Sequence, residues 1–455
     1  MTLNPNIFKA YDIRGVYPRD LNEKTAYKIG VAFANLIGEE MGKKKLSIAV
    51  AGDMRLSTPV LKDNLIRGLS EAGASVWDMN MLSTPSFYFG VSYLQTDGGV
   101  MVSASHNPKD WNGFKLTRAK AKPVSGEKGI NKIKEKIETN NLKTSEKEGE
   151  IKSYFNILEE QSKHDLTFFH PEKIKPLKIV VDPANGMGAQ YIEKVFRNIP
   201  AQLIKMNFEI DGTFPSHEAD PIKEENLAPL KEKIKKESGD LGVAIDGDGD
   251  RIFFVDEKGE AIDQSIIRGI LAKLFLQEKP GAKICYDIRP GRITRDLIEK
   301  NGGIPVITRV GHSLIKEKVL EEGAYFAGES SGHFFLNTEM GCFEVPIIII
   351  GKLLEEFSQA NKKISEYIKP YKKYHHSGEI NRKVKDKNKV FAKIEEKYSD
   401  GEINKLDGIS VEYPDFWFNV RGSNTEEKIR LNLEAKTKEK MEEKRDEVLK
   451  VITSI

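Results

Sequence analysis

Apolar and polar positions repeat in the same order in three separate parts of the chain. A short apolar run, at residues 46–51, 179–181 and 283–286, leads into a loop rich in Gly, Asp or Arg and then into a helical stretch. A strand followed by a helix is the repeating unit of a parallel α/β sheet. The pattern therefore predicts three related α/β domains. Their helices are expected over 58–72, after the second strand as far as about 198, and after the third strand as far as about 300.

The pattern changes in the last part of the chain. Residues 408–434 alternate apolar and polar positions around a turn at 422–424, and a charged segment over 437–450 predicts an amphipathic helix. Two stretches poor in apolar residues resemble joints: 132–152, expected to hold an exposed helix and then a polar linker, and 367–376. We therefore predict an α/β protein with three related mixed-sheet domains and a smaller α+β C-terminal domain around a central cleft, divided at 1–149, 150–258, 259–369 and 370–455.

Composition narrows the class of protein. The 455 residues are 39% hydrophobic, which excludes global disorder and suits about three domains. Lys and Arg number 71 against 69 Asp and Glu, so no broad nucleic-acid-binding surface is expected. The longest apolar run, 345–350, is far below the roughly 18 residues that cross a bilayer, and the N-terminus lacks a signal-peptide pattern. Two cysteines cannot form a disulfide framework, so we expect a cytoplasmic protein. The charge balance and the short apolar runs lead us to expect no nucleic-acid and no membrane partner.

Two loops that follow apolar strands carry reactive side chains. Residues 102–108 read Val-Ser-Ala-Ser-His-Asn-Pro, and Asn-Gly-Phe-Lys follows at 112–115. A hydroxyl beside an imidazole at the end of a strand suits a nucleophile, and a polar turn is the alternative. The second loop, Asp-Gly-Asp-Gly-Asp-Arg at 246–251, brings three carboxylates together between flexible glycines, which suits Mg²⁺ or Ca²⁺. An EF-hand is rejected because Arg251 takes the place of its glycine and a strand is predicted next.

Two further loops carry groups that recognise ligands. Residues 328–333 read Gly-Glu-Ser-Ser-Gly-His, whose acceptors and donors suit a hydroxyl-rich ligand such as a sugar. Residues 421–430 place two arginines around a turn that contains Ser, Asn and Thr, which suits a dianion. Ordinary loops and solvated turns remain alternatives for each. Together the four loops, one in each predicted domain, favour a cleft that handles a phosphorylated polyol.

With these motifs the chain resembles the α-D-phosphohexomutase family, of the phosphomannomutase/phosphoglucomutase type. The resemblance includes the four loops, Lys-Ala-Tyr-Asp-Ile-Arg-Gly at 9–15, Gly-Thr-Phe-Pro-Ser-His-Glu-Ala-Asp-Pro at 212–221 and Gly-His-Ser at 311–313. It implies four domains in a heart-shaped arrangement, the fourth acting as a lid. The implied partner is a sugar phosphate, and we expect a monomer or a weak homo-oligomer.

The resemblance also implies residue roles, motif by motif. Ser105 would be the phosphorylated serine, and one of its phosphate oxygens would join Asp246, Asp248 and Asp250 around Mg²⁺. The other implied catalytic residues are Arg14, His106, Lys115 and Arg251. The implied substrate-binding residues are Tyr11, Arg289, His312, Glu329, Ser331 and His333. The phosphate that does not react would be held by Arg421, Ser423, Asn424, Thr425 and Arg430.

The implied reaction moves a phosphoryl group between two positions of one hexose. Phosphorylated Ser105 gives its group to O1 or O6 of mannose or glucose phosphate, and the resulting 1,6-bisphosphate, also the expected activator, returns its other phosphate to Ser105. Lys115 or His106 would serve as general acid and base. Arg289 stands where bacterial dual-specificity relatives carry Lys, which leaves the sugar preference open.

Three other functions remain as alternatives. Phosphoglucosamine mutases typically have Gln at the position of Ser330, so this loop favours the mannose/glucose type. A metal-dependent sugar phosphatase would also form phosphoserine but would release inorganic phosphate. A catalytically silent sugar-phosphate-binding protein would not need the Asp triplet and Lys115.

Overall fold

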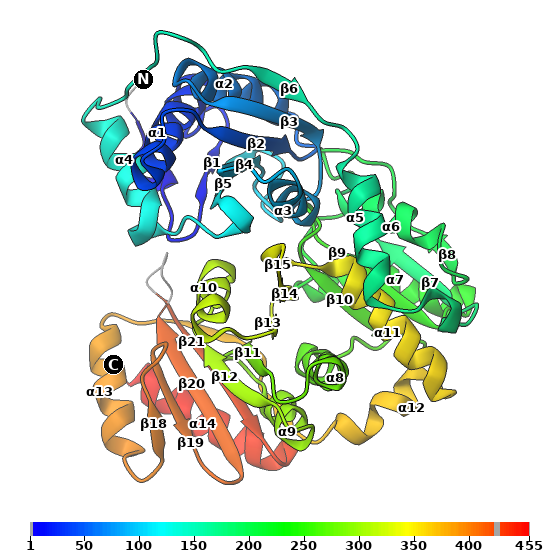
Figure 1. Cartoon of the computed structure of the whole chain (residues 1–455). Coiled ribbons are helices and arrows are strands. Elements are labelled where there is room, and N and C mark those ends of the chain that lie inside the picture. Colours follow the sequence, from blue (N-terminus) through cyan, green and yellow to red (C-terminus); the bar gives the residue numbers. More distant parts are fainter. Residues whose placement is uncertain (1–2, 423–427, 455) are drawn as a thin grey trace.

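The first domain is built on a mixed sheet covered by helices. The computed structural model describes residues 3–422 and 428–454 (Figure 1). The sheet has the order β1-β5-β4-β2-β3-β6, in which β2 runs parallel to β3 and β4, and β5 is antiparallel to β1 and β4. Its strands are β1 (Ile13–Val16), β2 (Ser47–Gly52), β3 (Ser75–Met81), β4 (Gly98–Val102), β5 (Trp111–Arg118) and β6 (Ile151–Ser153). Its helices are α1 (Glu23–Met41), α2 (Thr58–Glu71), α3 (Thr84–Tyr93) and α4 (Asn131–Glu138).

The second and third sheets are also mixed, with orders β10-β9-β7-β8 and β12-β11-β13-β14-β15. The second unit contains α5 (Ile157–Asp165), β7 (Lys178–Asp182), α6 (Gly188–Phe196), β8 (Gln202–Lys205), α7 (Glu224–Glu237), β9 (Leu241–Ile245) and β10 (Ile252–Asp256). The third contains α8 (Gln264–Glu278), β11 (Lys283–Asp287), α9 (Arg292–Lys300), β12 (Ile304–Thr308), α10 (His312–Glu322), β13 (Phe326–Gly328), β14 (Phe334–Thr338), β15 (Gly341–Glu344), α11 (Pro346–Ala360) and α12 (Ile364–Ile368).

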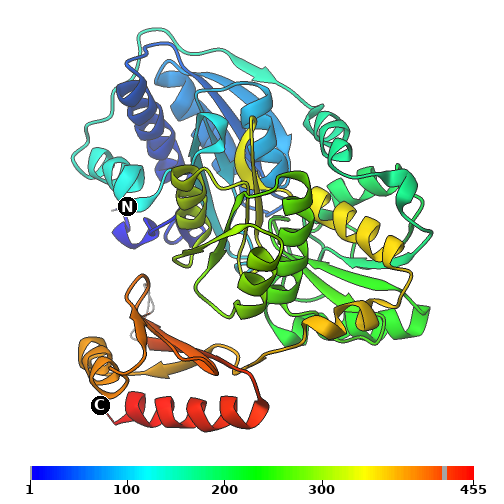
Figure 2. The ribbon, with the colours of Figure 1, turned by 60° about the horizontal axis from the view of Figure 1, so that its bottom comes forward.

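The fourth sheet is antiparallel and differs from the other three. Its order is β16-β21-β20-β19-β18, with β17 also paired to β21. It comprises β16 (His375–His376), β17 (Ile380–Lys383), α13 (Lys387–Lys397), β18 (Glu402–Asn404), β19 (Ile409–Glu412), β20 (Phe416–Gly422), β21 (Lys428–Ala435) and α14 (Lys438–Thr453). Figure 2 shows this domain set apart from the other three, with α14 along its outer side. Among the described residues, no helix has the length and apolar character needed to span a membrane.

The three predicted strand–loop–helix units are confirmed as β2–α2, β7–α6 and β11–α9, and the α/β fold class with a smaller last domain is confirmed as well. The stretch 132–152 differs from the expected exposed helix and linker. Helix α4 buries Ile133 and Ile137, so it is only half exposed. Residues 151–153, past the predicted boundary at 149, form β6 and pair with β3 of the first sheet.

Among the described residues, five buried hydrophobic clusters hold these sheets, and two of them show how the domains are joined. One buried cluster runs without interruption through the first three domains, from Phe87 on α3 through Val181 on β7 to Ile270 on α8 and Phe326 on β13. The fourth domain has a separate core between its sheet and its two helices, which includes Leu431 on β21. The first three domains therefore form one packed body, to which the fourth is attached through the segment after α12 (Figures 1 and 2).

Candidate active site

The loop after β4 holds Ser105 in an unusual backbone conformation. Ser105 is 2% exposed and has a φ of 52°, in the left-handed region that costs a non-glycine residue energy. A buried guanidinium stabilises this loop: Arg55 donates from Nη2 to the carbonyls of Ser105 (2.7 Å) and Asn107 (2.6 Å), and from Nη1 to those of Pro108 (2.7 Å) and Trp111 (3.0 Å). Asp53 pairs with Arg55 at 3.2 Å and keeps its charge compensated.

The hydroxyl of Ser105 lies against groups from its own loop and from the second domain. It donates to Asp246 Oδ2 at 3.0 Å and lies 3.2 Å from Nδ1 of His106. The pKa of His106 is lowered well below its ordinary value, first by burial and then by Arg251 and Arg14. The imidazole is therefore neutral near pH 7. A neutral imidazole can accept a proton from a hydroxyl.

Asp246, Asp248 and Asp250 follow β9, and each offers an oxygen within 4.8 Å of the others. All three are buried, and burial together with the other two carboxylates raises the pKa of Asp246 well above its ordinary value. Among the described residues nothing donates a hydrogen bond to Asp248 Oδ1. An orphaned carboxylate oxygen inside an all-oxygen cluster fits a hard divalent cation. The strand predicted after the cluster is β10.

Lys115 joins the first two domains at this cluster. Lys115 is only 3% exposed, and its ammonium lies 2.6 Å from both Asp248 and Asp250. Burial opposes its charge, but the two carboxylates outweigh burial and raise its pKa well above the ordinary lysine value. Arg14 adds a second cation beside the serine loop: its Nη1 donates to the Ala104 carbonyl (3.2 Å) and to Asn107 Oδ1 (2.6 Å).

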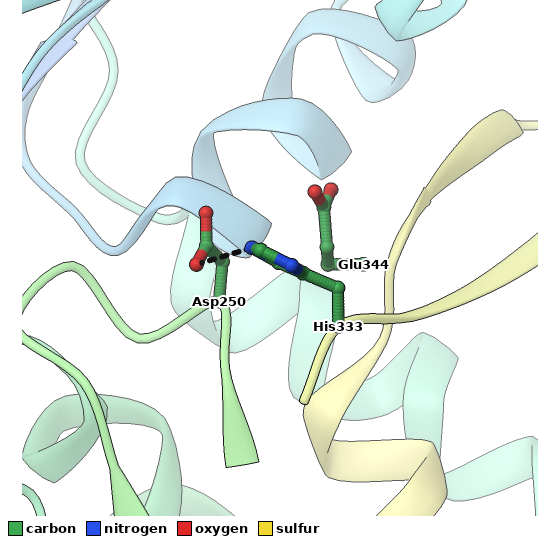
Figure 3. Close-up of side chains that lie close together, drawn as sticks. All are labelled: Asp250, His333 and Glu344. Carbon is green, nitrogen blue, oxygen red and sulfur yellow. Dashed lines mark hydrogen bonds and ion pairs between the residues drawn. The ribbon is translucent and has the colours of Figure 1, made fainter. Parts of the chain in front are cut away.

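The third loop, after β13, is tied to the carboxylate cluster by a histidine. His333 contacts Asp250 through Nε2 at 3.1 Å and Glu329 through Nδ1 at 3.0 Å, and Ser331 donates to Glu329 at 3.0 Å. Burial lowers the pKa of His333, but Asp250 and Glu329 outweigh it and raise that pKa to about 9. Figure 3 shows His333 pointing at Asp250, with Glu344 on its other side. Because Nε2 faces Asp250 and Nδ1 faces Glu329, His333 has no free ring nitrogen for a metal, although Asp250, His333 and Glu344 lie close together.

The remaining predicted sugar-binding residues lie around this loop. The ring of His312 lies 6.0 Å from Tyr11 and 5.9 Å from His333. Arg289 pairs with Asp287 and reaches Ser331 Oγ at 3.5 Å. The structure therefore brings Tyr11 of the first domain next to side chains of the third.

The predicted phosphate-binding arginines lie on paired strands of the fourth domain. Arg421 on β20 is the register partner of Arg430 on β21. Both contact Glu379: Arg421 Nη2 at 2.6 Å and Arg430 Nη1 at 3.0 Å. Ser423, Asn424 and Thr425 lie outside the described residues.

Sequence reasoning missed three residues that contact these groups. Arg55 supports the serine loop, Thr84 donates to Asp248 Oδ2 at 2.5 Å, and Glu379 pairs with both arginines. The polar loop at 52–55 after the first repeated strand was a signal for Arg55. Thr84 and Glu379 stand in no motif with a recognisable spacing.

Comparison with protein families gives matches along the whole chain. The phosphoglucomutase/phosphomannomutase models for alpha/beta/alpha domains I, II and III match residues 5–144, 152–259 and 263–374, and the model for the C-terminal domain matches 379–451.

Full-length relatives are similar as well. A phosphomannomutase of Methanocaldococcus jannaschii is 40% identical over 451 residues, covering 99% of this chain and 98% of the relative. A phosphomannomutase/phosphoglucomutase of Pseudomonas aeruginosa is 38% identical over 450 residues, covering 97% and 94%. A crystal structure of a phosphoglucomutase/phosphomannomutase family protein from Burkholderia thailandensis has a TM-score of 0.90 and 31% identity, covering 100% of this chain and 98% of that one.

Proposed function

Because the chain belongs to the phosphoglucomutase/phosphomannomutase family, we propose that it is an enzyme that interconverts hexose 1-phosphate and hexose 6-phosphate, with mannose or glucose as the sugar. The observation that carries this proposal is the meeting of Ser105, Lys115 and the three aspartates from two domains within hydrogen-bond distance. We also assign one part of the site to each of the domains 1–149, 150–258, 259–369 and 370–455, with residues 151–153 joining the sheet of the first domain.

The proposed reaction is two phosphoryl transfers in opposite directions. Phosphorylated Ser105 loses its phosphoryl group to the free O6 or O1 of a hexose monophosphate, which gives up its hydroxyl proton and becomes a 1,6-bisphosphate. The intermediate reorients, its other phosphate moves to the Ser105 oxygen, and the leaving sugar oxygen takes back a proton. Hexose 1,6-bisphosphate therefore also serves as activator, because it phosphorylates an enzyme that has lost its phosphate.

Asp246, Asp248 and Asp250, with an oxygen on Ser105, would hold Mg²⁺, as the orphaned Asp248 oxygen indicates. The bound ion would supply positive charge for the oxygens of the transferring group. The chain adds its own cations there, since Lys115 contacts two of the carboxylates and Arg14 donates into the serine loop. Such charge stabilisation is the main requirement of phosphoryl transfer.

We propose His106 and Lys115 as the candidates for moving the proton of the sugar hydroxyl. His106 is neutral and 3.2 Å from the serine oxygen, whereas Lys115 is charged as long as its carboxylate partners remain paired with it. Arg251, whose guanidinium lies 3.9 Å from Asp246 and 4.0 Å from Asp220, would add positive charge beside the carboxylate cluster.

We assign recognition of the sugar and of its distant phosphate to the third and fourth domains. Glu329 and Ser331 would bind the sugar hydroxyls, with Tyr11, Arg289, His312 and His333 around them. The non-reacting phosphate would be bound by Arg421, Ser423, Asn424, Thr425 and Arg430.

Phosphorus NMR of the purified protein tests this function. Mannose 1-phosphate, glucose 1-phosphate and glucosamine 1-phosphate are incubated separately with Mg²⁺ and a trace of hexose 1,6-bisphosphate. We expect a 6-phosphate signal to grow in the mannose or glucose tube without inorganic phosphate, and to vanish with EDTA. Ser105→Ala should lower turnover by more than about a thousandfold, because the step that it removes is the covalent one. Growth of inorganic phosphate would instead indicate a phosphatase, and conversion of the glucosamine phosphate alone would indicate the third sugar.

A further inference from the structure

A carboxylate already occupies the two arginines that are proposed to bind phosphate. Glu379, directly before β17, places Oε2 2.6 Å from Arg421 Nη2 and Oε1 3.0 Å from Arg430 Nη1. Asn432 Nδ2 lies 3.5 Å from the same Oε2. Both oxygens of one carboxylate therefore contact guanidinium groups of two paired strands, which is a strong charge-assisted arrangement.

The charges around Glu379 show that it is ionised and faces the site. Its side chain is 27% exposed; burial raises its pKa, but Arg421 and Arg430 outweigh burial and lower the pKa below the ordinary value. Arg289 of the third domain acts on it in the same direction. The carboxylate thus lies in the field of arginines from two domains, where an incoming phosphate would also be attracted.

We propose that Glu379 competes with the substrate phosphate for Arg421 and Arg430 and thereby sets how tightly the fourth domain holds its ligand. This inference rests on the proposed function, in which these arginines bind the non-reacting phosphate. A phosphate dianion carries more charge and more acceptor oxygens than a carboxylate, so it displaces Glu379 on binding. When the phosphate leaves, Glu379 pairs with the guanidinium groups again.

This exchange lowers the barrier to release. Arg421 is 7% exposed, and a buried guanidinium that loses its anion without replacement is costly. A resident carboxylate provides the replacement, at the expense of affinity for phosphate. In a reaction whose intermediate must present first one end and then the other, weaker and exchangeable phosphate binding favours turnover, because uniformly tight binding lowers KM without raising kcat.

Titration calorimetry with inorganic phosphate tests the competition without any turnover. Wild type, Glu379→Gln and Glu379→Ser are compared in 0.3 M KCl, which screens long-range attraction more than direct contacts. We expect both variants to bind phosphate about tenfold more tightly than wild type. The matched control is Glu395→Gln, which removes a carboxylate of the same domain that pairs with Lys405 at 2.6 Å; its phosphate affinity should equal that of wild type.

Steady-state kinetics provide the second readout. For Glu379→Gln we expect KM for the hexose 1-phosphate and kcat both to fall by about three- to tenfold. Mere destabilisation of the domain would not lower KM in this way. Equal or weaker phosphate binding by both variants overturns the proposal, because Glu379 would then orient the arginines instead of competing for them. Absence of mutase turnover together with tighter phosphate binding would reject the proposed function and leave the competition standing. Absence of phosphate binding in all proteins would reject both.

Discussion

At the residue scale, the position of the Ser105 hydroxyl oxygen depends on Arg55, which contacts the carbonyl of Ser105 and not its hydroxyl. The five contacts of Arg55 join Asp53 to the four carbonyls of the serine loop, and the whole side chain is buried. Because Ser105 has a positive φ, the loop needs such contacts to keep a conformation that is costly on its own. Only a planar group with several donors can reach four carbonyls at once.

Arg55→Lys should therefore impair the reaction more than binding. Lysine keeps the charge next to Asp53 but cannot make the branched contacts, so the serine oxygen is less well placed. We expect kcat to fall by about a hundredfold, the usual result of a displacement near 1 Å, with KM within about twofold of wild type. Both constants are measured with glucose 1-phosphate.

Arg67→Lys is the matched control, because Arg67 is an exposed arginine of α2 that pairs with Glu71 on the same helix. It should leave kcat unchanged. A full-rate Arg55→Lys enzyme, or a rise in KM as large as the loss in kcat, would contradict this role for Arg55.

The same scale explains which site residues the sequence could predict. The three aspartates lie within five residues, so their convergence follows from the local backbone. Glu379 is more than forty residues away from both arginines that it contacts, and Thr84 is 164 residues from Asp248. Contacts at that separation depend on the packing of whole domains, which no local pattern contains.

At the scale of elements, the fourth domain is joined to the third through helix N-termini. Asp263 caps α8 by accepting from the Ser265 amide at 2.7 Å, and it also pairs with His376 on β16. Glu434 on β21 accepts from the amides of Gly291 and Arg292, at the start of α9, at 3.3 Å each. Negative groups are favoured at helix N-termini, so these carboxylates stabilise the junction as well as the helices.

The His376 pair should make this junction sensitive to pH. The hydrogen bond to Asp263 raises the pKa of His376, burial opposes this, and Asp263 and Glu434 add to the rise. A histidine whose folded pKa is raised stabilises the fold below its unfolded pKa of about 6.5, and this contribution is lost as pH rises through the folded pKa. His376→Gln should therefore lower the melting temperature of the fourth domain, to which His376 belongs, by about 2 °C at pH 6 and by less at pH 9.5.

The melting temperatures are measured by scanning calorimetry in low salt. His375→Gln is the control, because it changes the neighbouring exposed histidine of the same strand. It should shift the melting temperature equally at both pH values. A larger effect of His376→Gln at pH 9.5 than at pH 6 would show that the ion pair does not stabilise the junction.

At the scale of the whole molecule, the repeated strand–loop–helix pattern was sufficient to predict three α/β units, because hydrophobic periodicity is a local property. The sheet orders and the membership of β6 were not predictable in this way. Residues 151–153 are exposed and contain one apolar side chain, so their pairing with β3 depends on backbone hydrogen bonds and not on a hydrophobic pattern. The continuous core of the first three domains likewise results from their mutual packing.

The separate core of the fourth domain predicts that the chain unfolds in two steps, the fourth domain separately from the other three. Leu431→Ala removes buried volume from the fourth-domain core, and Ile270→Ala does so in the shared core; each should cost about 3 kcal/mol. Because the fourth domain is small, Leu431→Ala should lower its transition by about 10 °C or more and leave the other in place, whereas Ile270→Ala should lower only the larger transition, by about 5 °C. Calorimetry of the full chain resolves the two. A single transition that both substitutions lower would contradict this prediction. It would show that the contacts between the third and fourth domains, Asp263 with His376 and Glu434 with the start of α9, couple the cores into one cooperative unit.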